Sequence, residues 1–182
     1  MKKYFLMIML IHKLSGATFT SFNELEKAFP NKIITNATIT FDLTQLDFKG
    51  WTFINTIFSD SDSMGNTVFD NTTLQGKDSK STIFSNSIKS GSFIKAKISN
   101  VQFYNRIENC VFDGAELENV KFIQGAPGSS FKNATLNNIT FNGPHDGSFS
   151  EAKISNCTND QGKLLKLSFG KLSLPEEKVD NK

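Results

Sequence analysis

The sequence is short of arginine, proline and cysteine, and its charges nearly balance. Its 182 residues include 4 Pro, 2 Cys and a single Arg, and 20 Lys plus Arg stand against 18 Asp plus Glu, a formal charge of +2. So small a charge leaves no electrostatic footprint for nucleic acid, and one Arg supplies almost no bidentate phosphate contact. Two cysteines cannot build a disulfide scaffold. The 18 Phe residues exclude a disordered chain, so we expect one folded domain.

The first residues have the features of an export signal. Met1-Lys2-Lys3 is a basic start, Tyr4 to Ile11 is an apolar run, and Ser15-Gly16-Ala17 offers small residues for cleavage. The pattern predicts a signal peptide over residues 1–17 and a secreted or periplasmic protein. An apolar run of eight is too short to cross a bilayer, which takes about 20 residues. The alternative is a buried N-terminus, which would leave the protein cytoplasmic or directly injected into a host cell.

The next segment, residues 18–41, predicts a cap. Ser21 followed by Glu24 is a capping box, and the apolar residues of Phe22 to Phe29 fall on one face at helical spacing. Lys32 to Phe41 then becomes β-like, with several Ile and Thr residues. A short helix leading into a first strand is what the exposed end of a solenoid needs.

From residue 91 onward the chain repeats, with offsets of 19, 19 and 18 residues between rows. Large apolar residues recur five positions apart, and each is preceded two positions earlier by a small or β-branched residue. The small residues form three columns: Gly91, Cys110, Ser129 and Gly147; Ala96, Ala115, Ala134 and Ala152; Val101, Val120, Ile139 and Cys157. Neither a helix nor a flat strand has this period. A chain that bends at every fifth residue does, with the large residues pointing inward.

These rows resemble the pentapeptide-repeat family, whose unit is commonly written A-(D/N)-L-x-x with Leu or Phe at the centre. The resemblance covers about Leu43 to Asn156, and it departs from the family pattern where Lys, Glu, Thr or Ser precedes the centre. It implies an all-β fold, a right-handed parallel β-helix with four sides. The spacing of the repeat centres in this sequence predicts about six turns. The expected divisions are the signal at 1–17, the cap at 18–41, the repeats at 42–158, and a C-terminal cap and tail at 159–182.

A column of asparagines accompanies the repeats. Asn100, Asn119, Asn138 and Asn156 each lie two residues after a centre. Asparagine tolerates turn conformations, and its amide can stack as a hydrogen-bonded ladder. We therefore interpret the column as structural.

Residue types that carry chemistry are scattered. Cys110 and Cys157 occupy small inward positions in different columns, so we expect two free, buried thiols. His145 has no Cys, His or carboxylate at ligand spacing, and the Asp60–Gly65 segment only partly follows a calcium loop. We predict no metal site, no cofactor and no enzymatic activity.

The leading functional hypothesis is a non-enzymatic module that binds another protein, in a secreted or envelope-associated bacterial protein. The first alternative is the β-helical part of a bacterial effector delivered to host cells, which some pentapeptide-repeat proteins are. A DNA mimic resembling gyrase inhibitors needs a strongly acidic rod, whereas residues 41–158 sum to −2. A β-helix polysaccharide enzyme would need clustered carboxylates. Exposed solenoid ends or strand edges also suggest self-association.

The predicted binding residues are Tyr104, Arg106 and Ile123. Residues just after a centre should face solvent and are mostly polar, yet Tyr104 and Ile123 interrupt that rule in adjacent turns. The single Arg lies two residues beyond Tyr104. Exposed apolar residues beside an Arg have the composition of interface hot spots. We place them on the irregular fourth side of the rod, where the alternative is that loops bury them.

Overall fold

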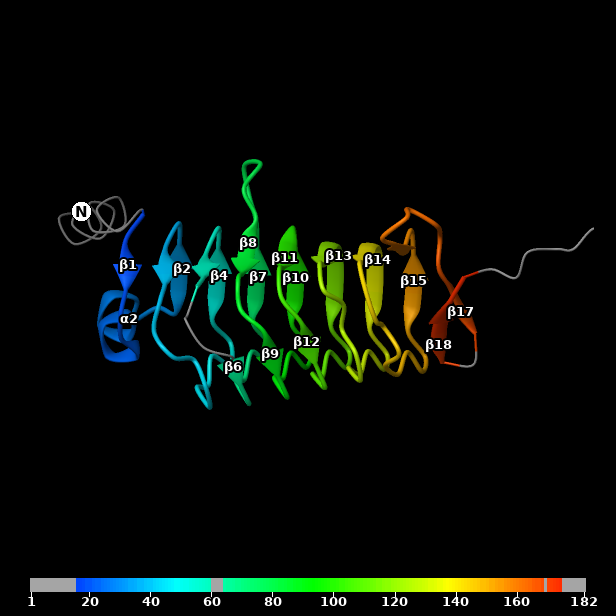
Figure 1. Ribbon diagram of the computed structural model, residues 1–182. Coiled ribbons are helices and arrows are strands. Elements are labelled where there is room, and N and C mark those ends of the chain that lie inside the picture. Colours follow the sequence, from blue (N-terminus) through cyan, green and yellow to red (C-terminus); the bar gives the residue numbers. More distant parts are fainter. Residues whose placement is uncertain (1–15, 60–63, 169, 175–182) are drawn as a thin grey trace, which may run out of the picture.

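The computed structural model describes residues 16–59, 64–168 and 170–174. Nearly all of the predicted signal peptide and the core of the Asp60–Gly65 segment lie outside the described residues. The described chain forms a parallel β-solenoid of about seven turns with one short helix at its N-terminal end (Figure 1). The predicted all-β solenoid is thus confirmed, with one more turn than expected.

The strands are short and follow one another in chain order. They are β1 (Thr18–Phe19), β2 (Ile33–Thr35), β3 (Thr38–Ile39), β4 (Thr52–Ile54), β5 (Ile57–Phe58), β6 (Met64–Gly65), β7 (Thr73–Gln75), β8 (Thr82–Phe84), β9 (Ile88–Lys89), β10 (Lys97–Ser99), β11 (Val101–Phe103), β12 (Ile107–Glu108), β13 (Glu116–Phe122), β14 (Thr135–Phe141), β15 (Lys153–Ser155), β16 (Thr158–Asn159), β17 (Lys166–Ser168) and β18 (Lys171–Ser173). All pairs are parallel except β17 with β18 and the single bridge between Thr158 and Leu164.

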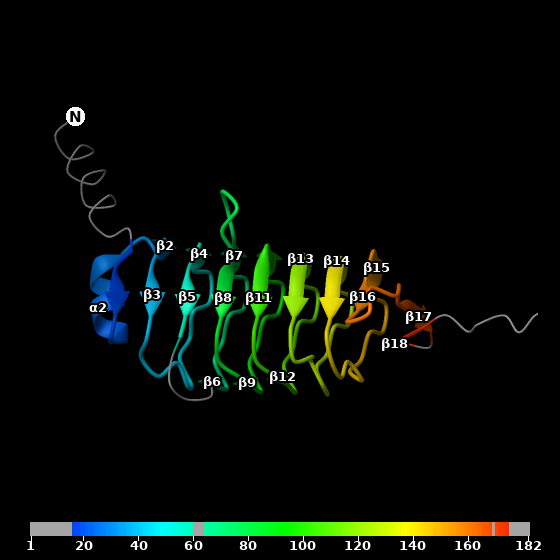
Figure 2. The same ribbon diagram turned by 45° about the horizontal axis from the view of Figure 1, so that its top comes forward.

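Strand pairing divides the solenoid into four faces. Face 1 is a row of single bridges from Asp47 to Ser148. Face 2 stacks β2, β4, β7, β10, the first halves of β13 and β14, and β15. Face 3 stacks β1, β3, β5, β8, β11, the second halves of β13 and β14, and β16 (Figure 2). Face 4 contains β6, β9 and β12.

The core is built from two columns of stacked phenylalanines. On face 1, Phe93 and Phe112 stack with ring centroids 4.6 Å apart, and Phe112 and Phe131 with 4.8 Å. A second column on face 3 meets the first edge to face, as where Phe112 and Phe122 lie 5.8 Å apart at 86°. These offset and T-shaped contacts are the favoured aromatic geometries. One ring per turn on each of faces 1 and 3 packs with buried Leu, Ile and Met side chains of faces 2 and 4, and together they fill the interior of the rod.

Small residues lie beside the rings, as the repeat predicts. Ala96, Ala115 and Ala134 are fully buried. At some small inward positions the residue is Ser or Thr, and its hydroxyl donates to a backbone carbonyl. Ser129 Oγ donates to Ile107 O at 3.1 Å, and Thr67 Oγ1 donates to Leu43 O at 2.8 Å. Buried hydroxyls are tolerated because each has a partner.

The corner between faces 2 and 3 depends on the asparagine column. Asn100, Asn119 and Asn138 all have a backbone φ of 53–54°, in the left-handed region that Asn tolerates better than most residues. The Asn119 amide donates to Asn100 Oδ1 at 3.2 Å, and the Asn138 amide donates to Asn119 Oδ1 at 2.7 Å. The predicted ladder is therefore present, and it turns the chain without ending the sheet.

Two substitutions of Asn119 separate the contribution of the amide ladder from that of the left-handed backbone conformation. Asn119→Ala loses the ladder and also places alanine in the left-handed region, and it should lower the free energy of unfolding by about 1–2 kcal/mol. Asn119→Gly loses only the ladder and should cost less, because glycine adopts positive φ freely. Urea unfolding of both variants measures the difference. Equal losses would show that backbone conformation at this corner contributes nothing.

The N-terminal cap differs in detail from the prediction. Helix α2 (Phe22–Ala28) is capped by Ser21, whose Oγ accepts from Glu24 N at 3.3 Å, but the Glu24 carboxylate accepts from Thr20 N and Oγ1 instead of from Ser21 N. Phe22 packs on Phe48 and Trp51 of the first full turn. The single strand predicted over 32–41 is wrong, because Asn36, with φ of 52°, breaks it into β2 and β3. This segment already forms a corner of the solenoid, which adds the extra turn.

One corner between faces 2 and 3 carries an insertion. The segment from Gly76 to Ser81 leaves the rod between β7 and β8 and projects outward (Figure 1). Asp78 and Ser79 have positive φ, and Lys80 N donates to Lys77 O at 3.0 Å, which closes the turn. A Cβ on Gly76 would lie 2.3 Å from Lys80 O, so only glycine fits where the two arms of the loop meet.

The C-terminal end is closed by the antiparallel hairpin β17–β18. Leu165 and Leu172 are buried against the last turn, and Phe149 N donates to Gly170 O at 2.6 Å. In the preceding turns the equivalent Phe N–H donates to a carbonyl of the next turn on face 1. The hairpin supplies the acceptor for the last of these N–H groups.

The two cysteines are free and buried, as predicted. Burial raises the pKa of the Cys110 thiol from its ordinary value of 9.0 to about 12, although the Gly91 N–H that points at Sγ opposes the shift. Between about pH 9 and about pH 12, the Cys110 thiol therefore keeps its proton in the folded state and loses it in the unfolded state.

This contrast predicts a pH dependence. The contribution of Cys110 to stability should be complete below about pH 9 and should be lost as pH rises toward about 12.

A disulfide-based thiol reagent at pH 8 should react with both cysteines no faster than the protein unfolds. Fast reaction of either thiol in the native protein would contradict the buried positions.

Candidate interaction surface

Four apolar side chains form a stripe on the outside of face 3. Ile57, Ile83, Tyr104 and Ile123 line one open depression of about 560 Å³ together with Ser85, Asn105 and Gln124. Tyr104 is 45% exposed and Ile57 37% exposed, while Ile83 and Ile123 are half-buried. We call this set the face-3 stripe. Loops therefore do not bury Tyr104 and Ile123.

The alternation of the strands explains why these side chains point outward. Ile57 and Ile83 come directly before the inward Phe58 and Phe84, and Tyr104 directly follows the inward Phe103. Successive side chains of a strand point to opposite faces. The register places them in two neighbouring columns. Ile57 pairs with Ile83, while Tyr104 and Ile123 lie two strand positions further along, because Ile83 pairs with Gln102 and Phe103 with Phe122.

A ladder of polar groups borders the stripe. The Gln124 amide donates to Asn105 Oδ1 at 2.9 Å, and the Asn105 amide donates to Ser85 O at 2.6 Å. These bonds hold the side chains at the corner next to Tyr104 and Ile123. The stripe is therefore presented on a fixed surface.

The structure moves the predicted site from one face to another. Tyr104 and Ile123 lie at the end of face 3, and the chain turns onto face 4 only afterwards. Arg106 is exposed but does not line the depression, and it directly precedes β12 on face 4. The structure thus brings Tyr104 and Ile123 together and places Arg106 at their flank.

Two members of the stripe were missed by the sequence argument. The predicted outward positions are those directly after a centre, whereas Ile57 and Ile83 come directly before one. The pattern Ile-Phe at 57–58 and 83–84 carries the signal, because two adjacent large residues in a strand cannot both face inward.

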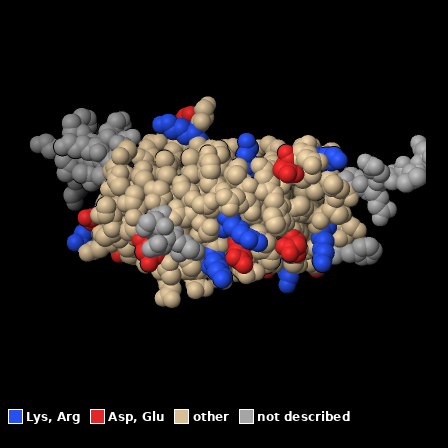
Figure 3. All heavy atoms as spheres, viewed as in Figure 1, with Lys and Arg blue, Asp and Glu red and all other residues tan. Residues whose placement is uncertain are grey.

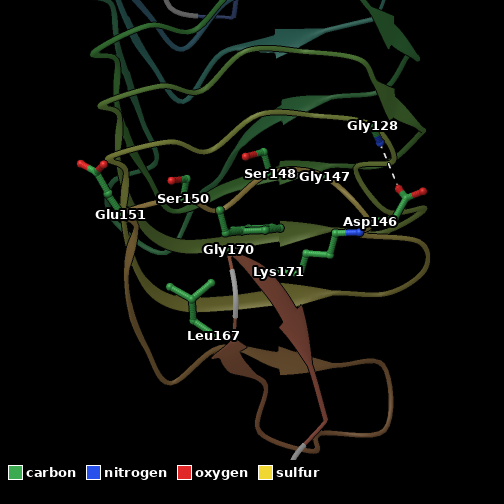
Figure 4. Close-up of a pocket in the computed structure, with 10 residues that line it drawn as sticks. Gly128, Asp146, Gly147, Ser148, Ser150, Glu151, Leu167, Gly170 and Lys171 are labelled. Carbon is green, nitrogen blue, oxygen red and sulfur yellow. Dashed lines mark hydrogen bonds between the residues drawn. The ribbon is translucent and has the colours of Figure 1, made fainter.

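A second depression, of about 450 Å³, lies between the last turn and the C-terminal hairpin. In Figure 4, Ser148 and Ser150 lie between Asp146 at one end and Glu151 at the other. Asp146 Oδ1 accepts from Gly128 N at 3.0 Å, so this carboxylate is engaged in holding a corner. The two carboxylates do not converge on a common point, which glycoside hydrolysis requires.

Charge and ligand chemistry are sparse in the part of the chain that the structure describes. Lys and Arg are interspersed with Asp and Glu on the side shown in Figure 3. No cluster of three or more His, Cys, Asp or Glu side chains suited to a metal occurs among the described residues. His145 contacts Gly143 O through Nδ1 at 2.9 Å and packs near Phe141. No described helix has the length and apolar character needed to cross a bilayer.

Comparisons with known proteins give no family and a distant structural similarity. No model of a known protein family matches the sequence, and no curated protein matches it. Among solved structures, the chain is similar to a pentapeptide repeat protein, Rfr23, from the cyanobacterium Cyanothece 51142. The two share 12% sequence identity with a TM-score of 0.37, over 77% of this chain and 95% of the other. The assignment to the β-solenoid class rests on this chain's own strand pairing.

Proposed function

We propose that the chain is a pentapeptide-repeat protein and a non-enzymatic interaction module that binds another protein through the face-3 stripe. The observation that carries the proposal is the run of exposed or half-exposed apolar side chains across neighbouring turns of a rigid scaffold. Isolated surface hydrophobics are normal, whereas a contiguous apolar strip with a Tyr at its centre has the composition of an interface. Solenoids present such extended surfaces.

The repeat supports the family part of the proposal. Inward centres and small inward residues recur through the described turns, and asparagine with positive φ recurs at the corner between faces 2 and 3. Faces that differ only in their outward side chains can diverge without disturbing the core. The outward side chains are most apolar on face 3, which carries the four residues of the face-3 stripe.

Site-specific photo-crosslinking tests the proposal in cells of the source organism. A photoreactive residue in place of Tyr104 should give discrete adducts with another protein, and excess parent protein should compete them away. The matched control places the same residue at Thr73 of face 2, a half-buried outward position. Adducts that are equal at both positions, or absent at position 104, would contradict binding through the stripe.

Export is proposed on the basis of the first 17 residues. Intact mass of the protein from its native host should show a chain shortened by this segment. A mass that includes Met1 to Ala17 in the functional protein would contradict a cleaved signal and would favour the effector alternative.

A further inference from the structure

The face-3 stripe runs along the axis of the rod. Ile57 and Ile83 are paired in neighbouring strands, and the Phe residues beside Ser85, Tyr104 and Ile123 are paired in the same way. The four apolar residues therefore occupy four consecutive turns, one residue in each turn, with Ile57 and Ile83 in one column and Tyr104 and Ile123 in a second column two strand positions, about 6.7 Å, further along. At about 4.8 Å between strands, the stripe is about 14 Å long.

The spacing of about 4.8 Å between turns matches a helical partner better than an extended one. An α-helix lying along the axis advances about 5.4 Å per turn, so one side chain per helical turn stays close to one solenoid turn over the whole stripe. An extended strand lying along the axis places same-face side chains about 6.7 Å apart, which is out of step after the first turn. A helix of about ten residues, about 15 Å long, covers the stripe.

The described charged residues within three positions of a stripe residue are basic, whereas Glu118 lies at the corner between faces 2 and 3 and Glu108 lies on face 4. Lys121 is exposed two residues before Ile123, and Arg106 is exposed two residues after Tyr104. The projecting loop at the neighbouring corner adds Lys77 and Lys80 against Asp78, and it is tied to face 3 where Gln102 Nε2 donates to Ser81 Oγ at 3.1 Å. None of the described residues that line the depression is charged, so the charges lie at its edges.

We propose that the occupant of the stripe is an acidic amphipathic helix of a partner protein. This inference rests on the proposed function and specifies its partner. The apolar side of the helix, with residues at i, i+4 and i+7, lies on Ile83, Tyr104 and Ile123. Carboxylates on its flanks face Lys121 and Arg106, which gives the complex electrostatic complementarity.

Peptide selection tests the occupant directly. A random library of peptides of about 16 residues, roughly 24 Å if helical, is selected against the full chain. Binders of the Tyr104→Ala, Ile123→Ser double variant are removed. Surviving peptides should be rich in Asp and Glu, should carry apolar residues at i, i+4 and i+7, and should gain helical circular dichroism on binding.

A charge reversal supplies the matched control. Lys121→Glu should weaken the selected peptides about tenfold, and the loss should shrink at high salt. Lys153→Glu makes the same charge change on face 2 and should leave binding unchanged. Basic peptides, peptides with alternating i, i+2 apolar residues, or no stripe-dependent peptide would each overturn the helical occupant. Adducts specific to position 104 with any of these results would leave the proposed function standing without its helical occupant, whereas absent or non-specific adducts remove the proposed function itself.

Discussion

Phe112→Ala is expected to lower the free energy of unfolding by about 3–5 kcal/mol. Phe112 is fully buried, stacked between Phe93 and Phe131, and in edge contact with Phe103 and Phe122. Its removal leaves a cavity in the middle of the rod that neighbouring rings cannot fill, because each is held in its own turn. Urea unfolding followed by circular dichroism measures the loss.

Two further variants make this result specific. Phe112→Leu retains most of the apolar volume and should cost clearly less than Phe112→Ala. Lys132→Ala removes an exposed side chain from the next turn of the same face and should change stability by less than about 0.5 kcal/mol. If Phe112→Ala is no worse than Lys132→Ala, the aromatic column does not hold the rod together.

Ala115→Leu is expected to cost about 1–3 kcal/mol through overpacking. Ala115 is fully buried, with Ala96 and Ala134 in the same column of the turns on either side. The added carbons have no space, because every turn repeats the same close approach. Thermal unfolding is the measurement, since about 1 kcal/mol shifts the midpoint of a chain of this size by about 2–4 °C.

The neighbouring position gives the control for Ala115→Leu. Glu116 is exposed and comes directly after Ala115, so Glu116→Leu adds apolar bulk on the outside of face 2. That variant should leave the midpoint nearly unchanged. An unchanged midpoint for Ala115→Leu would mean that the alanine column faces outward and that the register is wrong.

The interior could be predicted from the sequence because it repeats. Ring and alanine positions recur at fixed offsets, and one inward residue per face leaves a single register that buries them all. The C-terminal part of the stripe followed from the same register, since Tyr104 and Ile123 come directly after inward Phe residues.

The departures occur where the repeat is irregular. The corner at Asn36 is hidden in a run of Ile and Thr that reads as one strand, so the first turn was missed. Ile57 and Ile83 face outward because side chains alternate along a strand. The sequence alone does not show which residue of each Ile-Phe pair faces inward. Arg106 flanks the stripe and does not line it, because the chain turns a corner between Tyr104 and Ile107 that closeness in sequence does not show.

The most direct test of the face-3 stripe is the affinity of the partner captured at position 104. Titration calorimetry compares the parent chain with the Tyr104→Ala, Ile123→Ser double variant, and with a Thr73→Ala, Gln75→Ala double variant of face 2. The stripe variant should bind about 100-fold more weakly, as expected when two hot-spot side chains are removed, while the face-2 variant binds like the parent. Equal affinity of the stripe variant and the parent would contradict the assignment of face 3 as the binding surface.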